Sequence, residues 1–71
     1  MKQYLVIYEK AGGNYSAYVP DLPGCIACGD TLKETERLMK KAVELYIEAL
    51  KEEGQTVPEP VTTARPITIA A

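Results

Sequence analysis

Cys25 and Cys28 form a C-x-x-C motif, a spacing shared by zinc sites and redox enzymes. A structural zinc site needs four ligands, usually Cys or His, and the chain has two cysteines and no histidine. A thioredoxin-type site places such a pair at a helix N-terminus, whereas this pair falls in a short apolar segment with strand character. Residues three apart on a strand point to opposite faces. We therefore interpret both as small structural side chains. Metal shared between copies in an oligomer is the alternative, and a reducing cytosol disfavours a disulfide.

The carboxylates of Glu9, Asp21 and Asp30 are the groups that a metal-dependent nuclease would use. Such chemistry needs several convergent carboxylates that hold two ions about 4 Å apart. Each of these residues has a simpler position, at a strand end, in a Pro-rich loop and at a helix start respectively. Gly12-Gly13 is not a phosphate-binding loop, because neither Lys-Ser/Thr nor a helix follows it. We predict no catalytic residue, no metal and no cofactor.

Five tyrosines are the only aromatic residues, and they could either stack on nucleobases or anchor a protein interface. Surfaces that bind nucleic acid carry positive charge, whereas this chain has a net charge of −2 and a pI near 5.0. Tyrosine suits protein interfaces because it buries a large area while its hydroxyl tolerates water. The composition therefore favours a protein partner, and a basic one would match the charge.

The elements that must position these residues follow from hydrophobic patterning. Alternating apolar residues on both sides of a Gly-rich turn predict a hairpin, and apolar positions at spacings of three and four predict a helix. The predicted elements are a hairpin over 2–19, a third strand over 25–28, a helix over 31–53, a Pro-containing connector over 55–63 and a weak fourth strand over 65–70. The residues expected to form turns and helix ends are Gly12, Gly13, Pro23, Gly24, Asp30, Thr31, Glu34 and Gly54. The predicted core stripe of the helix is Leu32, Thr35, Leu38, Met39, Ala42, Leu45, Tyr46 and Ala49.

This order predicts a single α+β domain over 1–71, a β-β-β-α-β two-layer sandwich with a mainly antiparallel sheet and one long helix on one face. A chain of 71 residues buries only about 60% of its extended surface, so the monomer is marginally stable. The first strand is apolar on both faces. Either Tyr4, Val6 and Tyr8 or else Leu5 and Ile7 must therefore contact a second polypeptide. With no signal peptide or membrane-spanning run in the sequence, the expected location is the cytoplasm.

The segment YSAYVPDLPGC over 15–25, the run GDTLKE over 29–34 and the later VPEP over 57–60 together resemble the HicB antitoxin family of bacterial toxin–antitoxin systems. The resemblance covers roughly residues 4–60. It implies a partial ribonuclease-H-like fold, oligomerisation and inhibition of HicA, a small basic toxin that cleaves mRNA. Full-length members usually carry a C-terminal DNA-binding domain. Eleven residues follow Pro60, so the chain is expected to be a short form without that domain or autonomous nucleic-acid binding.

The resulting expectation is a non-enzymatic antitoxin that occludes the RNA-cleaving site of a HicA-like toxin and also binds itself as a homodimer or larger oligomer. A stand-alone homo-oligomeric regulatory or ligand-binding domain is the alternative, and a degenerate nuclease comes third. The residues predicted to contact a partner are Tyr4, Val6, Tyr8, Tyr15, Tyr18, Asp21, Leu22, Glu48, Glu52 and Glu53.

Overall fold

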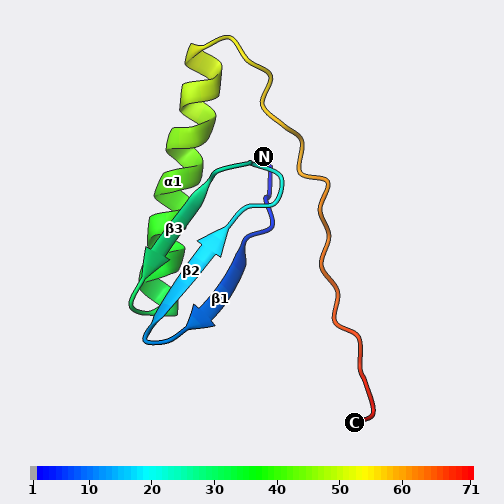
Figure 1. Ribbon diagram of the computed structural model, residues 1–71. Helices are drawn as coiled ribbons and strands as arrows, with labels where there is room; N and C mark the ends of the chain where they lie inside the picture. Colours follow the sequence, from blue (N-terminus) through cyan, green and yellow to red (C-terminus); the bar gives the residue numbers. More distant parts are fainter. Residues whose placement is uncertain (1) are drawn as a thin grey trace.

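The computed structural model describes residues 2–71 and has two layers, a three-stranded sheet and one helix (Figure 1). The elements are β1 (Ile7–Ala11), β2 (Asn14–Tyr18), β3 (Ile26–Gly29) and α1 (Leu32–Glu52). The sheet order is β1-β2-β3 with antiparallel pairing throughout. The helix packs mainly against β3 and β2, so β1 is the less covered edge. The predicted α+β class, with an antiparallel sheet and one long helix, is confirmed.

The first strand begins five residues later than the predicted hairpin. Ile7 pairs with Tyr18 at the end of the β1–β2 ladder, and continuing this register would place Leu5 opposite Pro20. Proline has no N–H to donate, so the ladder ends there. Residues 2–6 continue the direction of β1 without belonging to a strand. The turn residues behave as predicted, since Gly12 and Gly24 both adopt positive φ.

Both ends of α1 are formed by the predicted residues. The Thr31 hydroxyl accepts a hydrogen bond from the Glu34 N–H at 3.1 Å, and the Glu34 carboxylate accepts one from the Asp30 N–H at 3.0 Å. At the other end Gly54 has φ +71°, and the N–H of Gln55 reaches back to the Leu50 carbonyl at 2.9 Å. This is the Schellman arrangement that ends many helices.

The core lies between the sheet and one side of the helix. Its buried hydrophobic residues are Ala17, Val19, Leu22, Cys25 and Met39. The predicted helix stripe needs correction. Val43 packs against this core although the predicted stripe omitted it, whereas Leu32 and Leu45 are 44% and 54% exposed and Ala49 is also exposed. The stripe centres on Thr35, Met39 and Tyr46, and at 100° per residue Leu45 falls outside that arc.

The predicted fourth strand over 65–70 is wrong for the isolated chain. Residues 63–71, called the C-terminal arm below, leave the domain as an extended segment (Figure 1). Ile67 and Ile69 are 82% and 73% exposed, because the arm does not reach a sheet edge with which it could pair. Within residues 2–71, no backbone–backbone hydrogen bond involves the arm.

Candidate interaction surfaces

The sheet face turned away from α1, called the open face below, carries a row of apolar side chains. Ile7, Tyr18 and Ile26 are neighbours across the three strands. The next row across the strands contains Ala17, which is buried under the helix. Because successive residues of a strand point to opposite faces, the row with Tyr18 points away from the helix. Tyr18 is 39% exposed and Ile26 is 66% exposed. The sequence left open which side of the first strand faces away from the helix. The structure shows that it is the side with Ile7.

Tyr4, Val6 and Tyr8 lie on the helix side of the sheet, where they pack against the core. Together with Met39 and Val43 they line a groove of about 420 Å³ along the edge of β1, called the edge groove below. The groove is also lined by four charged residues, Lys2, Glu36, Lys40 and Glu44. The pKa of the Tyr8 phenol is raised by burial and, secondarily, by the negative charge of Glu36. The groove shows that the helix leaves the β1 edge of the core partly uncovered.

Leu22 was predicted to contact a partner, and the structure corrects this. It is completely buried, because the loop between β2 and β3 folds inward. The loop is closed by hydrogen bonds from the Leu22 N–H to the Val19 carbonyl and from the Cys25 N–H to the Leu22 carbonyl, both 3.1 Å. The Tyr46 hydroxyl donates to the Pro23 carbonyl at 2.8 Å and ties the loop to α1. Leu22 is therefore a core residue.

Asp21 binds the base of the C-terminal arm. Its carboxylate accepts hydrogen bonds from the Val61 and Thr62 N–H groups, both at 3.1 Å, and from the Thr62 hydroxyl at 2.7 Å. Nearby, the Tyr4 hydroxyl donates to the Pro58 carbonyl, and Lys2 pairs with Glu59 at 3.0 Å. These contacts hold the connector against the domain up to residue 62, so the arm starts from a defined position.

The Asp21 contacts predict a pH dependence for the base of the arm. Hydrogen bonds from the Thr62 hydroxyl and N–H, and then from the Val61 N–H, lower the Asp21 pKa below its ordinary value of 3.8. Because the folded pKa is the lower one, this attachment is present above pH 3.8 and lost as the pH falls through the folded value. In an NMR titration the amide signals of Val61 and Thr62 should therefore shift with a midpoint below 3.8. Asp21→Asn should remove the transition, and a wild-type midpoint at or above 3.8 would contradict the assignment.

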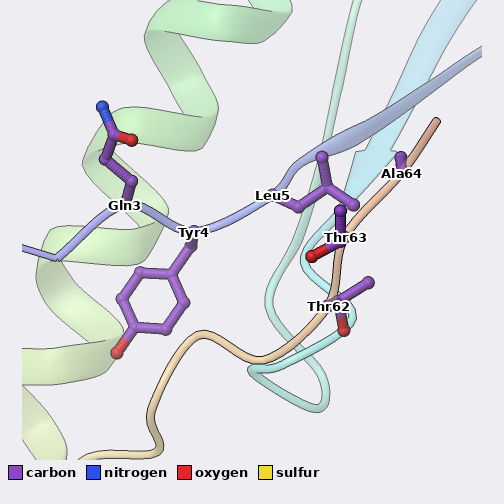
Figure 2. Close-up of a pocket in the computed structure, with 6 residues that line it drawn as sticks. All are labelled: Gln3, Tyr4, Leu5, Thr62, Thr63 and Ala64. Atoms are coloured by element: carbon purple, nitrogen blue, oxygen red, sulfur yellow. The ribbon is translucent and has the colours of Figure 1, made fainter.

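A cleft of about 510 Å³ separates the segment before β1 from the start of the arm (Figure 2). Gln3, Tyr4 and Leu5 line one side, and Thr62, Thr63 and Ala64 line the other. In Figure 2 the Leu5 side chain lies toward the arm, whereas the Tyr4 ring extends in a different direction. Two extended segments thus run past each other without pairing.

The residues considered for chemistry do not assemble into a site. Cys25 is buried and Cys28 is exposed, which agrees with the prediction that the two point to opposite sides, and burial raises the pKa of the Cys25 thiol. Within residues 2–71 no group of three or more His, Cys, Asp or Glu side chains is placed to hold a metal ion. In the same range, no helix is both long and apolar enough to cross a membrane.

The net charge of α1 changes sign along the helix. The first half has four basic residues against Glu34 and Glu36, whereas the second half has Glu44, Glu48 and Glu52 against Lys51, and Glu53 follows at the C-cap. The four basic residues are Lys33, Arg37, Lys40 and Lys41. Glu48, Glu52 and Glu53 are exposed as predicted, next to Lys51. The helix therefore presents an acidic end to solvent.

Tyr15 lies at the hairpin end, with the Lys10 ammonium 5.8 Å from its ring centre.

Sequence reasoning missed two features of these surfaces, the burial of Leu22 and the role of Asp21. A loop leucine between two prolines has no periodicity that would assign it to the core. The spacing of Asp21 from Thr62 likewise reveals nothing, because 41 residues separate them. The one available signal was compositional, since an apolar residue in a polar loop is expected to find a buried position.

The chain is similar in sequence to several known proteins. Residues 4–68 match the family described as the HicB_like antitoxin of bacterial toxin-antitoxin systems. A UPF0150 protein of Synechocystis sp. is 42% identical over 67 residues, which cover 93% of this chain and 85% of that protein. A UPF0150 protein of Thermoplasma acidophilum is 38% identical over 71 residues, the full length of both chains. No solved structure matches the chain significantly. From the family match and the extent of these similarities, the chain belongs to the HicB-like antitoxin family.

Proposed function

We propose that the protein neutralises a basic HicA-type ribonuclease by covering the toxin's RNA-binding site, and that it does so by binding alone, without catalysis. The observation that carries the proposal is the family match over residues 4–68, together with an apolar face that the fold leaves open. An enzyme site that holds RNA presents positive charge. An acidic domain with an exposed apolar row can cover such a site through complementary charge and a desolvated centre.

The open face is the surface we assign to the toxin. Tyr18 and Ile26 form an exposed aromatic–aliphatic pair on adjacent strands, and Glu9 lies on the same face one pair further along β1. Interfaces concentrate their binding energy in a few such anchors surrounded by polar groups. Tyr15 has the same alternation as Ala17 and so lies on the helix side of β2. Tyr15 and the acidic end of α1 are therefore proposed to act in the encounter with the toxin, before the contact at the open face forms.

The proposal also includes self-association in the cytoplasm, where an mRNA-cleaving toxin would act. The chain exposes 5651 Å² of surface, whereas a compact monomer of 7.8 kDa exposes about 4,400 Å². The excess of about 1,250 Å² is larger than the roughly 800 Å² that one partner contributes to a standard interface. A second copy is the partner that such a surplus suggests.

Co-expression with the product of the neighbouring gene tests the function. If that product is a small basic protein that stops growth when expressed alone, this chain should restore growth and co-purify with it. Purified chain should also stop RNA cleavage by the purified toxin at near-stoichiometric amounts. Absence of both rescue and complex would favour the stand-alone regulatory domain, whereas divalent-metal-dependent RNA cleavage by this chain alone would favour a nuclease.

The acidic end of α1 is expected to speed toxin binding more than it strengthens the complex. Replacing Glu48, Glu52 and Glu53 with Gln removes three exposed negative charges. The association rate at low salt should fall about tenfold and lose most of its salt dependence, while the dissociation rate stays nearly constant. Stopped-flow measurement across salt concentrations checks this, with Glu36→Gln in the first half of α1 as control. An unchanged, salt-insensitive association rate would exclude steering by this end.

A further inference from the structure

The C-terminal arm has exposed apolar side chains and unpaired backbone groups, and the edge groove is an open surface that could accommodate them. The arm has two isoleucines exposed to water, and none of its backbone groups is paired with backbone in residues 2–71. The groove, of about 420 Å³, exposes Val6, Met39 and Val43 beside an edge strand, although charged side chains of α1 and Lys2 also line it. The Cα radius of gyration is 14.0 Å, whereas a compact chain of this length has about 11 Å. The arm, which extends well away from the two layers in Figure 1, accounts for this difference.

We propose that two copies exchange their C-terminal arms, so that residues 67–70 of each copy add as an antiparallel strand to the β1 edge of the other and insert Ile67 and Ile69 into its edge groove. This deepens, and rests on, the self-association part of the proposed function. It is independent of the toxin. The exchange is reciprocal, with the same two surfaces used on each copy, as a closed two-fold dimer requires.

The β1 edge is favoured over the β3 edge by the packing of the helix. Because α1 covers mainly β3 and β2, the groove that remains open is at β1, where Met39 and Val43 meet Val6 and Tyr8. An added strand with its isoleucines on this side completes the core. With its isoleucines on the open face they would stay in water. Burying an isoleucine side chain is favourable, so the orientation with both isoleucines in the groove is preferred.

The arm does not close well on its own chain. Figure 1 shows it running in the same general direction as β1, and the cleft places Thr62–Ala64 beside Gln3–Leu5. A parallel pairing with Thr62 opposite Gln3 and Ala64 opposite Leu5 would place Ile67 opposite Tyr8 but Ile69 opposite Lys10, which does not line the groove. An antiparallel arm from a second copy can instead set both isoleucines against Tyr4, Val6 and Tyr8. Pro66 lies just before the added strand, a position that proline tolerates.

The family match supports the arm as part of the domain rather than an appendage, because it extends to residue 68 and so includes Ile67. The contacts of Asp21 with Val61 and Thr62 hold the base of the arm on its own domain. The point from which each arm leaves is therefore fixed before exchange, and only residues beyond 62 need to become ordered on binding.

Sedimentation equilibrium tests the exchange. Wild-type chain should behave as a dimer, twice the 7.8 kDa chain mass. The variant Ile67→Asp/Ile69→Asp should remain folded by circular dichroism, because both side chains are mostly exposed in the monomer. Its dimer dissociation constant should rise about 100-fold or more. The control Thr68→Asp/Ala70→Asp changes the other side of the same segment and should stay dimeric.

A mixed-copy NMR experiment identifies the contact itself. The variant Ala70→Cys/Cys25→Ser/Cys28→Ser carries a spin label at position 70. This labelled chain is mixed with ¹⁵N-enriched wild-type chain that carries no spin label. Broadening at Val6, Tyr8 and Val43 is expected. Broadening at β3 instead, or persistence of the dimer in Ile67→Asp/Ile69→Asp, would overturn arm exchange while leaving self-association intact. A monomeric wild type would overturn both, and toxin rescue would still report separately on the antitoxin role.

Discussion

Replacing Gly29 with alanine is expected to lower the free energy of unfolding by about 3 kcal/mol. A Cβ at this position would lie 2.6 Å from the Thr35 hydroxyl oxygen and 3.1 Å from the Thr35 backbone nitrogen. Thr35 cannot yield easily, because it is completely buried and its hydroxyl donates to the Thr31 carbonyl at 2.7 Å. The end of β3 and the first turn of α1 would have to separate.

Gly13→Ala is the matched control, since a Cβ there meets nothing within 4 Å and the residue is not among the positive-φ glycines. It should change stability by less than about 1 kcal/mol, in the stabilising direction, by restricting the unfolded chain. Urea denaturation at one fixed protein concentration measures both, because self-association makes stability concentration-dependent. Adding Thr35→Ala should recover part of the loss in Gly29→Ala. A Gly29→Ala variant as stable as wild type would show that β3 and α1 can shift apart freely.

The elements with strong local patterns were predictable from the sequence. The helix boundaries followed from Thr31, Glu34 and Gly54, whose roles depend on hydrogen bonds within a few residues. The hairpin followed from alternation around Gly12-Gly13. Elements that depend on distant partners were not predictable in the same way. Residues 2–6 fail to join β1 because Pro20 faces them across the sheet, a relation set by register rather than by their own β propensity.

The candidate surfaces also combine features that follow from local sequence patterns with features that depend on distant residues. Sequence alone established that β1 is apolar on both sides, but it could not say which side the helix covers, because both periodicities are equally apolar. Register decides it, since the pairing Tyr8–Ala17–Ala27 lies under α1. The weak strand over 65–70 was predicted from real alternation at Ile67 and Ile69. The arm, however, does not reach an edge of its own sheet, so under the proposed exchange the β1 edge of a second copy supplies the partner for this pattern.

Loss of the apolar row on the open face is expected to weaken toxin binding by about 100-fold or more. The variant is Tyr18→Ala/Ile26→Gln. Both side chains point away from the helix and are substantially exposed in the free protein, so their replacement should leave the fold intact. In a complex they would be desolvated at the centre of the interface, where truncating an anchor typically costs 2 kcal/mol or more. The neutral substitutions also leave the overall charge, and thus the association rate, nearly unchanged.

Leu45→Gln provides the matched control, because Leu45 is 54% exposed on the helix, in the layer opposite the open face. It should bind the toxin like wild type. Calorimetric titration with a catalytically inactive form of the co-expressed toxin gives the affinities, and growth rescue gives the consequence in cells. Equal weakening by both variants would mean that general surface hydrophobicity, rather than this face, governs binding. Undiminished binding by Tyr18→Ala/Ile26→Gln would show that the toxin does not bind the open face. The acidic end of α1 would then be the next candidate, and the association rates of the Glu48, Glu52 and Glu53 variant test it independently.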